Sequence, residues 1–179
     1  MQVKMKKTIK RVLVLLIILV LGFFIFIIIS KTKQKREIAS TIQTIPNFSF
    51  TKLNNDTFSN ENLNENIPTL FINFNSECDY CQIEAQSIKD NVSKLKNIQI
   101  LFISSEPIEK IKNFGNTYKL MEHKNIILLF DKNDVFSTLF DTNTIPTSLI
   151  YNKNQHLIKK HKGQLKAKNI IKEINNSNE

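Results

Sequence analysis

The sequence predicts an α/β sandwich, in which a mainly parallel sheet carries helices on both faces. Short apolar, β-prone runs alternate along the chain with segments of helical periodicity. Several of these runs are apolar throughout, which is typical of parallel strands that are buried on both faces. A hairpin pattern towards the C-terminal end adds antiparallel strands at one edge of the sheet. The 179 residues suffice for one such domain and an additional segment.

The expected elements follow one another from residue 46 onwards. In chain order they are a β-element over 46–58, one helical turn over 59–63, a central strand over 70–74, a helix over 78–95, a strand over 98–104, a helix from 107 that breaks near Gly115, a strand over 125–130, a short helix over 133–140, a hairpin over 147–161 and a closing helix over 166–174. Ser76 is the expected cap of the helix that starts at residue 78.

This helix carries both cysteines of the chain, Cys78 and Cys81, in its first turn. Residues three apart are neighbours on a helix, so the two sulfurs can reach each other. The unpaired N–H groups and the dipole at the helix N-terminus favour a thiolate, which is the attacking species in disulfide exchange. Cys78 lies at the helix end and is the expected nucleophile. Cys81 lies on the apolar stripe and is the expected resolving thiol.

Glu84 lies one turn beyond Cys81, at the edge of the apolar stripe that includes Ala85 and Ile88. A half-buried carboxylate at this place can take a proton from Cys81 or return one to it. A solvated glutamate without a chemical role is the alternative. The sequence leaves both readings open.

Two other roles of the cysteine pair fit the sequence less well. A zinc site needs two more Cys or His ligands at suitable spacing, but His123, His156 and His161 are scattered. A structural disulfide between Cys78 and Cys81 would close a loop too short to constrain the unfolded chain much. We therefore expect a redox pair, with no metal and no cofactor.

The positive charge of the chain is concentrated at its N-terminal end. The formal net charge is +9, but residues 1–36 hold nine Lys or Arg and no acid, whereas residues 37–179 hold 16 basic and 16 acidic groups. A nucleic-acid-binding domain needs basic charge clustered on its folded surface. The distribution therefore argues against a nucleic-acid partner.

The basic residues bracket a long apolar segment, residues 12–29. Eighteen apolar residues in a helix span about 27 Å, close to the hydrocarbon thickness of a bilayer. A cleaved signal peptide has a shorter apolar core that ends in small residues, whereas residues 23–29 are bulky. We expect an uncleaved single-pass transmembrane helix.

The charges on either side of this segment suggest an orientation. Five basic residues precede the segment, four follow it closely, and the amino terminus adds one positive charge to the first side. The positive-inside rule then places the N-terminus in the cytoplasm and the body on the extracytoplasmic, or periplasmic, side. The expected organisation is a basic flank and anchor over 1–36, a tether over 37–45 and a domain over 46–179.

With these elements in place, the chain resembles the thioredoxin fold. More narrowly, it resembles the membrane-anchored TlpA/ResA group of bacterial envelope proteins, within the wider redoxin families. The resemblance covers about residues 46–175 and rests on the motif Cys78-Asp79-Tyr80-Cys81 after a strand, on Glu84, on Ile145-Pro146-Thr147 before a strand, and on Gly163 beyond the hairpin.

The resemblance implies a thiol–disulfide oxidoreductase that acts on disulfides of envelope proteins and receives electrons from an upstream donor. It also implies that Pro146 follows a cis peptide bond, faces the cysteine pair and leaves nearby backbone groups free for an extended substrate. The chain departs from the family in having no tryptophan, with Glu77 before the first cysteine, and Asp-Tyr inside the motif. These departures leave the choice of substrate open.

Two alternative functions remain. A peroxide-reducing redoxin commonly has a Thr three residues before its peroxidatic cysteine, but Asn75 stands there before Cys78. A copper-handling protein of the Sco type uses two cysteines one residue further apart and a distant His. Both patterns fit this chain less well than disulfide exchange does.

The charges next to Cys78 suggest a direction for the exchange. Glu77 and Asp79 flank this cysteine, and no basic residue adjoins it in the sequence. Negative neighbours disfavour a thiolate and oppose the helix dipole. The sequence therefore favours a reductant or an isomerase over a strong oxidant.

Overall fold

The computed structural model describes residues 16, 19–31 and 40–177, and the chain divides into two compact units, 1–40 and 41–179. In the first unit, residues 19–31 are helical and expose large apolar side chains. No helix among the described residues is long and apolar enough to cross a membrane. The predicted span over 12–29 lies partly outside the described residues, as do the basic flank 1–11 and residues 37–39 of the predicted tether.

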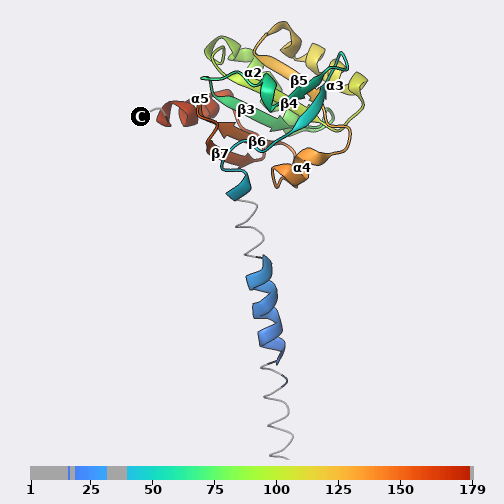
Figure 1. The fold of residues 1–179 in the computed structure, drawn as a ribbon. Helices are drawn as coiled ribbons and strands as arrows, with labels where there is room; N and C mark the ends of the chain where they lie inside the picture. The colour runs from blue at the N-terminus through green and yellow to red at the C-terminus, as the bar shows by residue number, and fades with distance from the viewer. Residues whose placement is uncertain (1–15, 17–18, 32–39, 178–179) are drawn as a thin grey trace, which may run out of the picture. The chain divides into compact units, whose positions relative to one another are not determined.

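The described part of the second unit is built on one seven-stranded sheet in the order β2-β1-β5-β4-β3-β6-β7 (Figure 1). The strands are β1 Ser49–Lys52, β2 Thr57–Ser59, β3 Thr69–Asn73, β4 Gln99–Ser104, β5 Ile126–Phe130, β6 Thr147–Tyr151 and β7 Leu157–Lys162. The three central strands β3, β4 and β5 are parallel, whereas the remaining pairings are antiparallel. The sheet is therefore mixed, with a buried parallel core.

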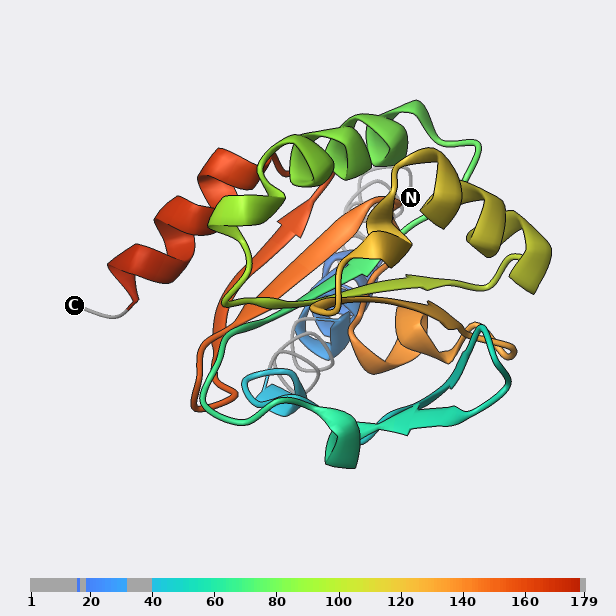
Figure 2. The same ribbon diagram turned by 90° about the horizontal axis from the view of Figure 1, so that it is seen from above.

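Helices cover both faces of this sheet, as the sequence predicts. They are α2 Asp79–Asp90, α3 Ile108–Thr117, α4 Val135–Leu139 and α5 Ala167–Asn176, with short 3₁₀ turns at η1 Asn60–Asn62, η2 Val92–Lys94 and η3 Leu120–Glu122. Buried residues of α2, α3 and α5 form one apolar cluster with the sheet, and α4 contributes to a second cluster. Figure 2 shows α2 (green), α3 (olive) and α5 (red) on one side of the sheet and α4 (orange) on the other.

Residues 41–45, which the sequence places at the end of the tether, belong to the second unit. Ile42 and Ile45 are buried in the α4-side cluster. The Tyr151 hydroxyl donates a hydrogen bond of 3.1 Å to the Ile42 carbonyl oxygen. This segment is therefore packed against the same face of the sheet as α4.

Two local expectations are wrong. Ser76 does not cap α2, because Cys78 is the N-cap residue and the helix begins at Asp79. Helix α3 does not break at Gly115 but continues to Thr117. A Cβ atom at Gly115 would lie 2.7 Å from a methyl carbon of Leu128 on β5, so the glycine allows α3 to approach the sheet closely.

Phe71 of β3 is the centre of the α4-side core. Its ring is fully buried, and its centroid lies 5.1 Å from that of Phe140, 5.5 Å from that of Phe48 and 5.7 Å from that of Tyr151. Buried aromatic side chains dominate core energetics, and such ring pairs add stability beyond their buried area. Because β3 leads directly to the cysteine loop, this packing also fixes the strand that supports the loop.

We expect Phe71→Ala to lower the free energy of unfolding by about 3–5 kcal/mol, because the substitution removes a fully buried ring and leaves a cavity. Phe71→Leu, which retains much of the volume, should cost clearly less. Denaturant titration of the full chain and both variants measures the difference. A loss below about 1 kcal/mol for Phe71→Ala would contradict the central role of this ring.

Candidate active site

The two cysteines lie at the carboxyl end of β3, where the loop 74–77 leads into α2. Cys78 is partly exposed and its backbone forms the N-cap, whereas Cys81 in the first turn is 1% exposed. Both thiols are free. One accessible sulfur with a buried sulfur one turn further along the helix is the arrangement that the sequence predicts. Their roles as nucleophile and resolving thiol stay predictions.

The loop before Cys78 is held by Glu106, which follows β4. One carboxylate oxygen of Glu106 accepts a hydrogen bond of 2.6 Å from the Ser76 amide, and the other accepts one of 2.8 Å from the Ser76 hydroxyl. The Gln82 side-chain amide donates a bond of 2.9 Å to the Ser76 carbonyl. The loop is thus tied both to α2 and to the segment after the neighbouring strand.

Glu106 is a residue that sequence reasoning missed. A signal for it exists, because β3 and β4 are parallel and their carboxyl ends meet at the same edge of the sheet. A polar residue just after β4 therefore lies near the loop after β3. The position of Glu106 could have been inferred in this way, but its hydrogen bonds with Ser76 could not.

The charge next to Cys78 also differs from the expectation. The Lys110 ammonium lies 2.6 Å from the carboxylate of Glu77 and 3.9 Å from that of Glu106. Its hydrogen bond and its positive charge lower the pKa of Glu77. Lys110 comes from α3, so a basic group that is remote in the sequence compensates the glutamate beside Cys78. The expectation that the charges of Glu77 and Asp79 disfavour a Cys78 thiolate is therefore weaker than the sequence suggests.

Glu84 is fully buried, which removes the reading of a solvated helix residue. Burial raises its pKa to about 7, although the Ser148 hydroxyl and the Leu165 backbone amide favour the charged form. The Ser148 hydroxyl donates a hydrogen bond of 2.7 Å to Oε1, whereas Oε2 has no hydrogen-bond partner among the described residues. A carboxyl group that titrates near neutrality suits proton transfer.

Burial also raises the pKa of the Cys81 thiol, and a hydrogen bond with Cys78 acts in the same direction. The negative charge of Glu84 contributes a further, smaller rise. Cys81 is therefore protonated in the resting dithiol, and it needs a base to become an attacking thiolate. Glu84 lies three residues further along the same helix and is also buried, and its role as the base that takes this proton stays a prediction.

The loop before β6 borders the cysteine pair. The Ile145–Pro146 peptide bond is cis, as expected from the resemblance. The Cys78 sulfur lies 4.0 Å from the Ile145 carbonyl oxygen. The Pro146 carbonyl accepts a hydrogen bond of 2.8 Å from the Gly163 amide. Pro146 thus lies next to the exposed thiol, while its part in substrate docking stays a prediction.

Exposed apolar side chains lie close in sequence to the cysteines and to Pro146. In the described part of the second unit, the exposed large hydrophobic residues are Tyr80, Ile83, Met121 and Ile145. Tyr80 lies between the two cysteines, Ile83 follows on α2, and Ile145 precedes Pro146. We call these three residues the apolar rim.

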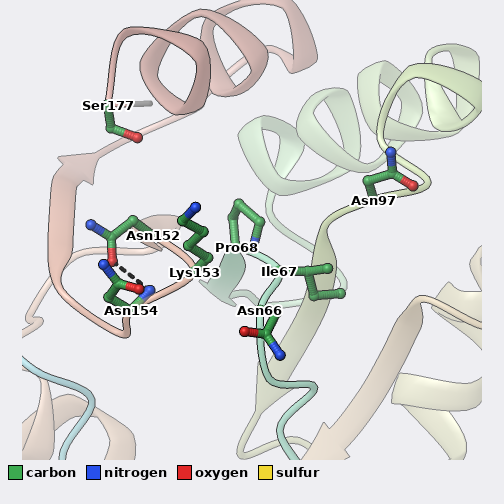
Figure 3. Close-up of a pocket in the computed structure, with 8 residues that line it drawn as sticks. All are labelled: Asn66, Ile67, Pro68, Asn97, Asn152, Lys153, Asn154 and Ser177. Atoms are coloured by element: carbon green, nitrogen blue, oxygen red, sulfur yellow. Dashed lines mark hydrogen bonds between the residues drawn. The ribbon is translucent and has the colours of Figure 1, made fainter. Parts of the chain in front are cut away.

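A hollow of about 490 Å³ lies away from the cysteines, at the amino end of β3 and beside the β6–β7 turn (Figure 3). Its lining is mostly polar: Asn66, Ile67, Pro68, Asn97, Asn152, Lys153, Asn154 and Ser177. It contains none of the predicted site residues. Among the described residues, no group of three or more His, Cys, Asp or Glu side chains is arranged to hold a metal ion.

Comparison with known proteins relates this arrangement to a family. The model of the AhpC/TSA family matches residues 42–160. No curated protein matches the chain. Among solved structures, a putative thioredoxin from Neisseria meningitidis is 25% identical, with a TM-score of 0.64, over 75% of this chain and 89% of that one.

Two further structures are less similar in sequence. A secreted Mycobacterium tuberculosis disulfide oxidoreductase is 16% identical, with a TM-score of 0.63, over 76% of this chain and 98% of that one. StoA from Bacillus subtilis is 15% identical, with a TM-score of 0.58, over 73% of this chain and 98% of that one. These likenesses establish the thioredoxin-like fold of the second unit.

The raised pKa of Glu84 predicts a pH-dependent stability. Because the folded-state pKa of about 7 lies above the ordinary value of 4.5, the folded state binds the proton more tightly than the unfolded state does. The stability from this group is fully present below about pH 4.5 and is lost as the pH rises through about 7. The loss amounts to about 3 kcal/mol.

We expect Glu84→Gln to remove this part of the slope, because the amide does not titrate. Denaturant titrations of the full chain between pH 4.5 and 8 measure it. The exposed Glu109→Gln serves as the matched control and should keep the wild-type slope. Equal slopes in wild type and Glu84→Gln would show that Glu84 has no raised pKa.

Proposed function

The chain belongs to the AhpC/TSA family of thioredoxin-like oxidoreductases, and we propose that it is a membrane-tethered enzyme that reduces or exchanges disulfides in envelope proteins. The observation that carries this proposal is the pairing of a partly exposed Cys78 at the start of α2 with a buried Cys81 one turn further on. The secreted Mycobacterium tuberculosis neighbour, a disulfide oxidoreductase, supports the same reaction class.

The geometry suggests the order of events. The Cys78 thiolate attacks one sulfur of a substrate disulfide, which forms a mixed disulfide and releases the other substrate sulfur as a thiolate. Cys81 then loses its proton to Glu84 and attacks the Cys78 sulfur. The substrate leaves as a dithiol, and the pair becomes a disulfide. Two electrons have passed to the substrate, and an upstream dithiol donor returns them to the pair.

The surroundings of Cys78 suit a protein substrate. The Ile145 carbonyl lies beside the thiol and accepts no backbone hydrogen bond within the described residues, so it is available to an extended segment. The apolar rim offers contacts to bulky side chains next to the target cysteine. A polypeptide segment can use both features at once, whereas a small peroxide is too small to contact the apolar rim while it is bound at the thiol.

The alternative functions receive less support from the site. The Cys78 sulfur contacts the Ile145 carbonyl oxygen and Cys81, and none of its contacts in the described residues is with a hydroxyl group of the kind found in a peroxide-reducing site. No His in the described residues joins Cys78 and Cys81 in a cluster able to hold copper. Disulfide exchange therefore remains the function that the geometry supports best.

We further propose that residues 12–29 anchor the chain, with the thioredoxin-like unit on the extracytoplasmic side. The described helical residues 19–31 expose their large apolar side chains, which include Leu19, Phe23 and Ile28. Such a surface is favourable in lipid and unfavourable in water. The bias of basic residues towards the N-terminal flank supports the orientation.

The proposed reaction predicts an asymmetric trapping pattern. Cys81→Ser should accumulate mixed disulfides through Cys78, because the thiol that resolves them is absent. Cys78→Ser should trap none, because the buried Cys81 cannot reach a substrate. Non-reducing electrophoresis of membranes from cells that produce each variant measures the adducts. The reversed pattern would refute the assignment of roles, and rapid peroxide consumption by wild type without disulfide exchange would favour the peroxide-reducing alternative.

The proposed anchor predicts a topology. A reporter that is active only outside the cytoplasm should work when it is fused after Glu179, because the positive-inside rule places the body there. The fusion should stay in the membrane fraction at high salt and high pH. A matched fusion that lacks residues 1–36 should lose both properties. Activity only of a cytoplasmic reporter would contradict the orientation.

A further inference from the structure

Ser148 of β6 is the only side chain in the described part of the chain that donates a hydrogen bond to Glu84. Its hydroxyl group lies 2.7 Å from Oε1, and both residues are fully buried. In the sheet, Ser148 lies opposite Ile72 of β3 and opposite His161 of β7. The contact thus joins α2 to the strand that begins directly after Pro146, across 64 residues of sequence.

A hydroxyl group suits a carboxyl group that changes its protonation state. It donates to an ionised carboxylate, and after rotation it accepts a hydrogen bond from a protonated carboxylic acid. The Ser148 hydroxyl can therefore form a hydrogen bond with both the ionised and the protonated form of Glu84. An amide or ammonium donor at this place would serve mainly the ionised state, and an alanine would serve neither.

The groups that interact electrostatically or by hydrogen bonds with Glu84 come from three parts of the chain. Cys81 lies on the same helix, Ser148 lies on β6, and the Leu165 backbone amide precedes α5. His161 of β7 is the titratable group that pairs with Ser148 in the sheet, but its Nε2 atom lies 3.2 Å from the Gln164 carbonyl oxygen instead. Without Ser148, the Leu165 backbone amide would be the remaining group that opposes the effect of burial on the Glu84 pKa.

We infer that Ser148 is a positioning residue for disulfide exchange, which holds the Glu84 carboxylate ready to accept the proton of Cys81. This inference rests on the proposed function. The hydroxyl bond occupies Oε1 and leaves Oε2, which has no partner in the described residues, to receive the proton. Ser148 touches neither the substrate nor the reacting sulfurs in this scheme.

The step that Ser148 supports is the release of the substrate. The mixed disulfide between Cys78 and the substrate is attacked by Cys81, whose proton moves to Glu84. A sulfur–sulfur bond forms between Cys81 and Cys78, and the bond between Cys78 and the substrate breaks. The substrate sulfur leaves as a thiolate and takes a proton from water, and Glu84 later returns its proton to solvent.

The test compares Ser148→Ala with Ser148→Thr in the full-length chain. Loss of the hydroxyl bond should raise the pKa of Glu84 by about one unit, because a hydrogen bond to a charged group is worth about that much. Reduction of insulin disulfides, with dithiothreitol as electron donor, should then fall about fivefold at pH 7 and recover at higher pH. Ser148→Thr keeps the hydroxyl group and should retain the wild-type pH profile.

Two controls separate this effect from a structural one. The titration of the Glu84 carboxyl carbon by NMR reports its pKa without any need for activity. In a Glu84→Gln background, Ser148→Ala should cause no further shift of the pH profile, because its target is absent. His161→Gln, which keeps Ser148 in place, should leave the Glu84 titration unchanged.

An unchanged Glu84 titration in Ser148→Ala would overturn the inference, whatever the activity. So would an equal effect of Ser148→Ala with and without Glu84. If wild type reduces no disulfides, the proposed function fails and the exchange role of Ser148 fails with it. If wild type is active and the Ser148→Ala profile matches it, only the role of Ser148 is wrong.

Discussion

The burial of a carboxyl group beneath α2 is the constraint on which the site depends. Removing an ionised carboxylate from water is costly unless hydrogen bonds compensate it, and Glu84 is fully buried with only one oxygen bonded to a described side chain. A core selected for stability alone would place an apolar residue here. A buried group that titrates near neutrality, adjacent to a thiol that needs a base, is an arrangement that favours chemistry over stability.

The topology of the sheet explains how remote residues meet at this point. Strands β3 and β4 are parallel, so Glu106 after β4 reaches the loop after β3. Strand β6 runs antiparallel to β3, so its first residues lie beside the last residues of β3, with Ser148 opposite Ile72. The cysteine loop, the Glu106 side chain that holds it and Ser148 therefore all lie at one edge of the sheet. A shift of β6 by one residue would turn Ser148 to the other face and separate it from Glu84.

Periodicity made much of this fold predictable. The alternation of apolar runs and helical stripes predicts the order of strands and helices, and the spacing of the cysteines predicts one exposed and one buried thiol. The Lys110–Glu77 ion pair, the Glu106 support and the Ser148–Glu84 bond were not predictable in the same way, because each joins residues 30 or more positions apart through side-chain geometry. Gly115 was misread because a glycine that breaks a helix and a glycine that allows close packing look alike in sequence.

In the proposed reaction, the unequal environments of the two sulfurs determine the order of the exchange steps. Cys78 faces solvent and the Ile145 carbonyl, where a substrate can approach. Ionisation of Cys81 is disfavoured, because burial and the neighbouring carboxylate raise the pKa of its thiol. The thiolate of Cys81 is therefore disfavoured unless its proton leaves in the same step as its attack. Formation of the disulfide removes this penalty, because neither sulfur then carries a charge. Burial thus destabilises the free thiolate of Cys81 but not the disulfide. In the proposed reaction, this difference favours release of the substrate when Glu84 accepts the Cys81 proton.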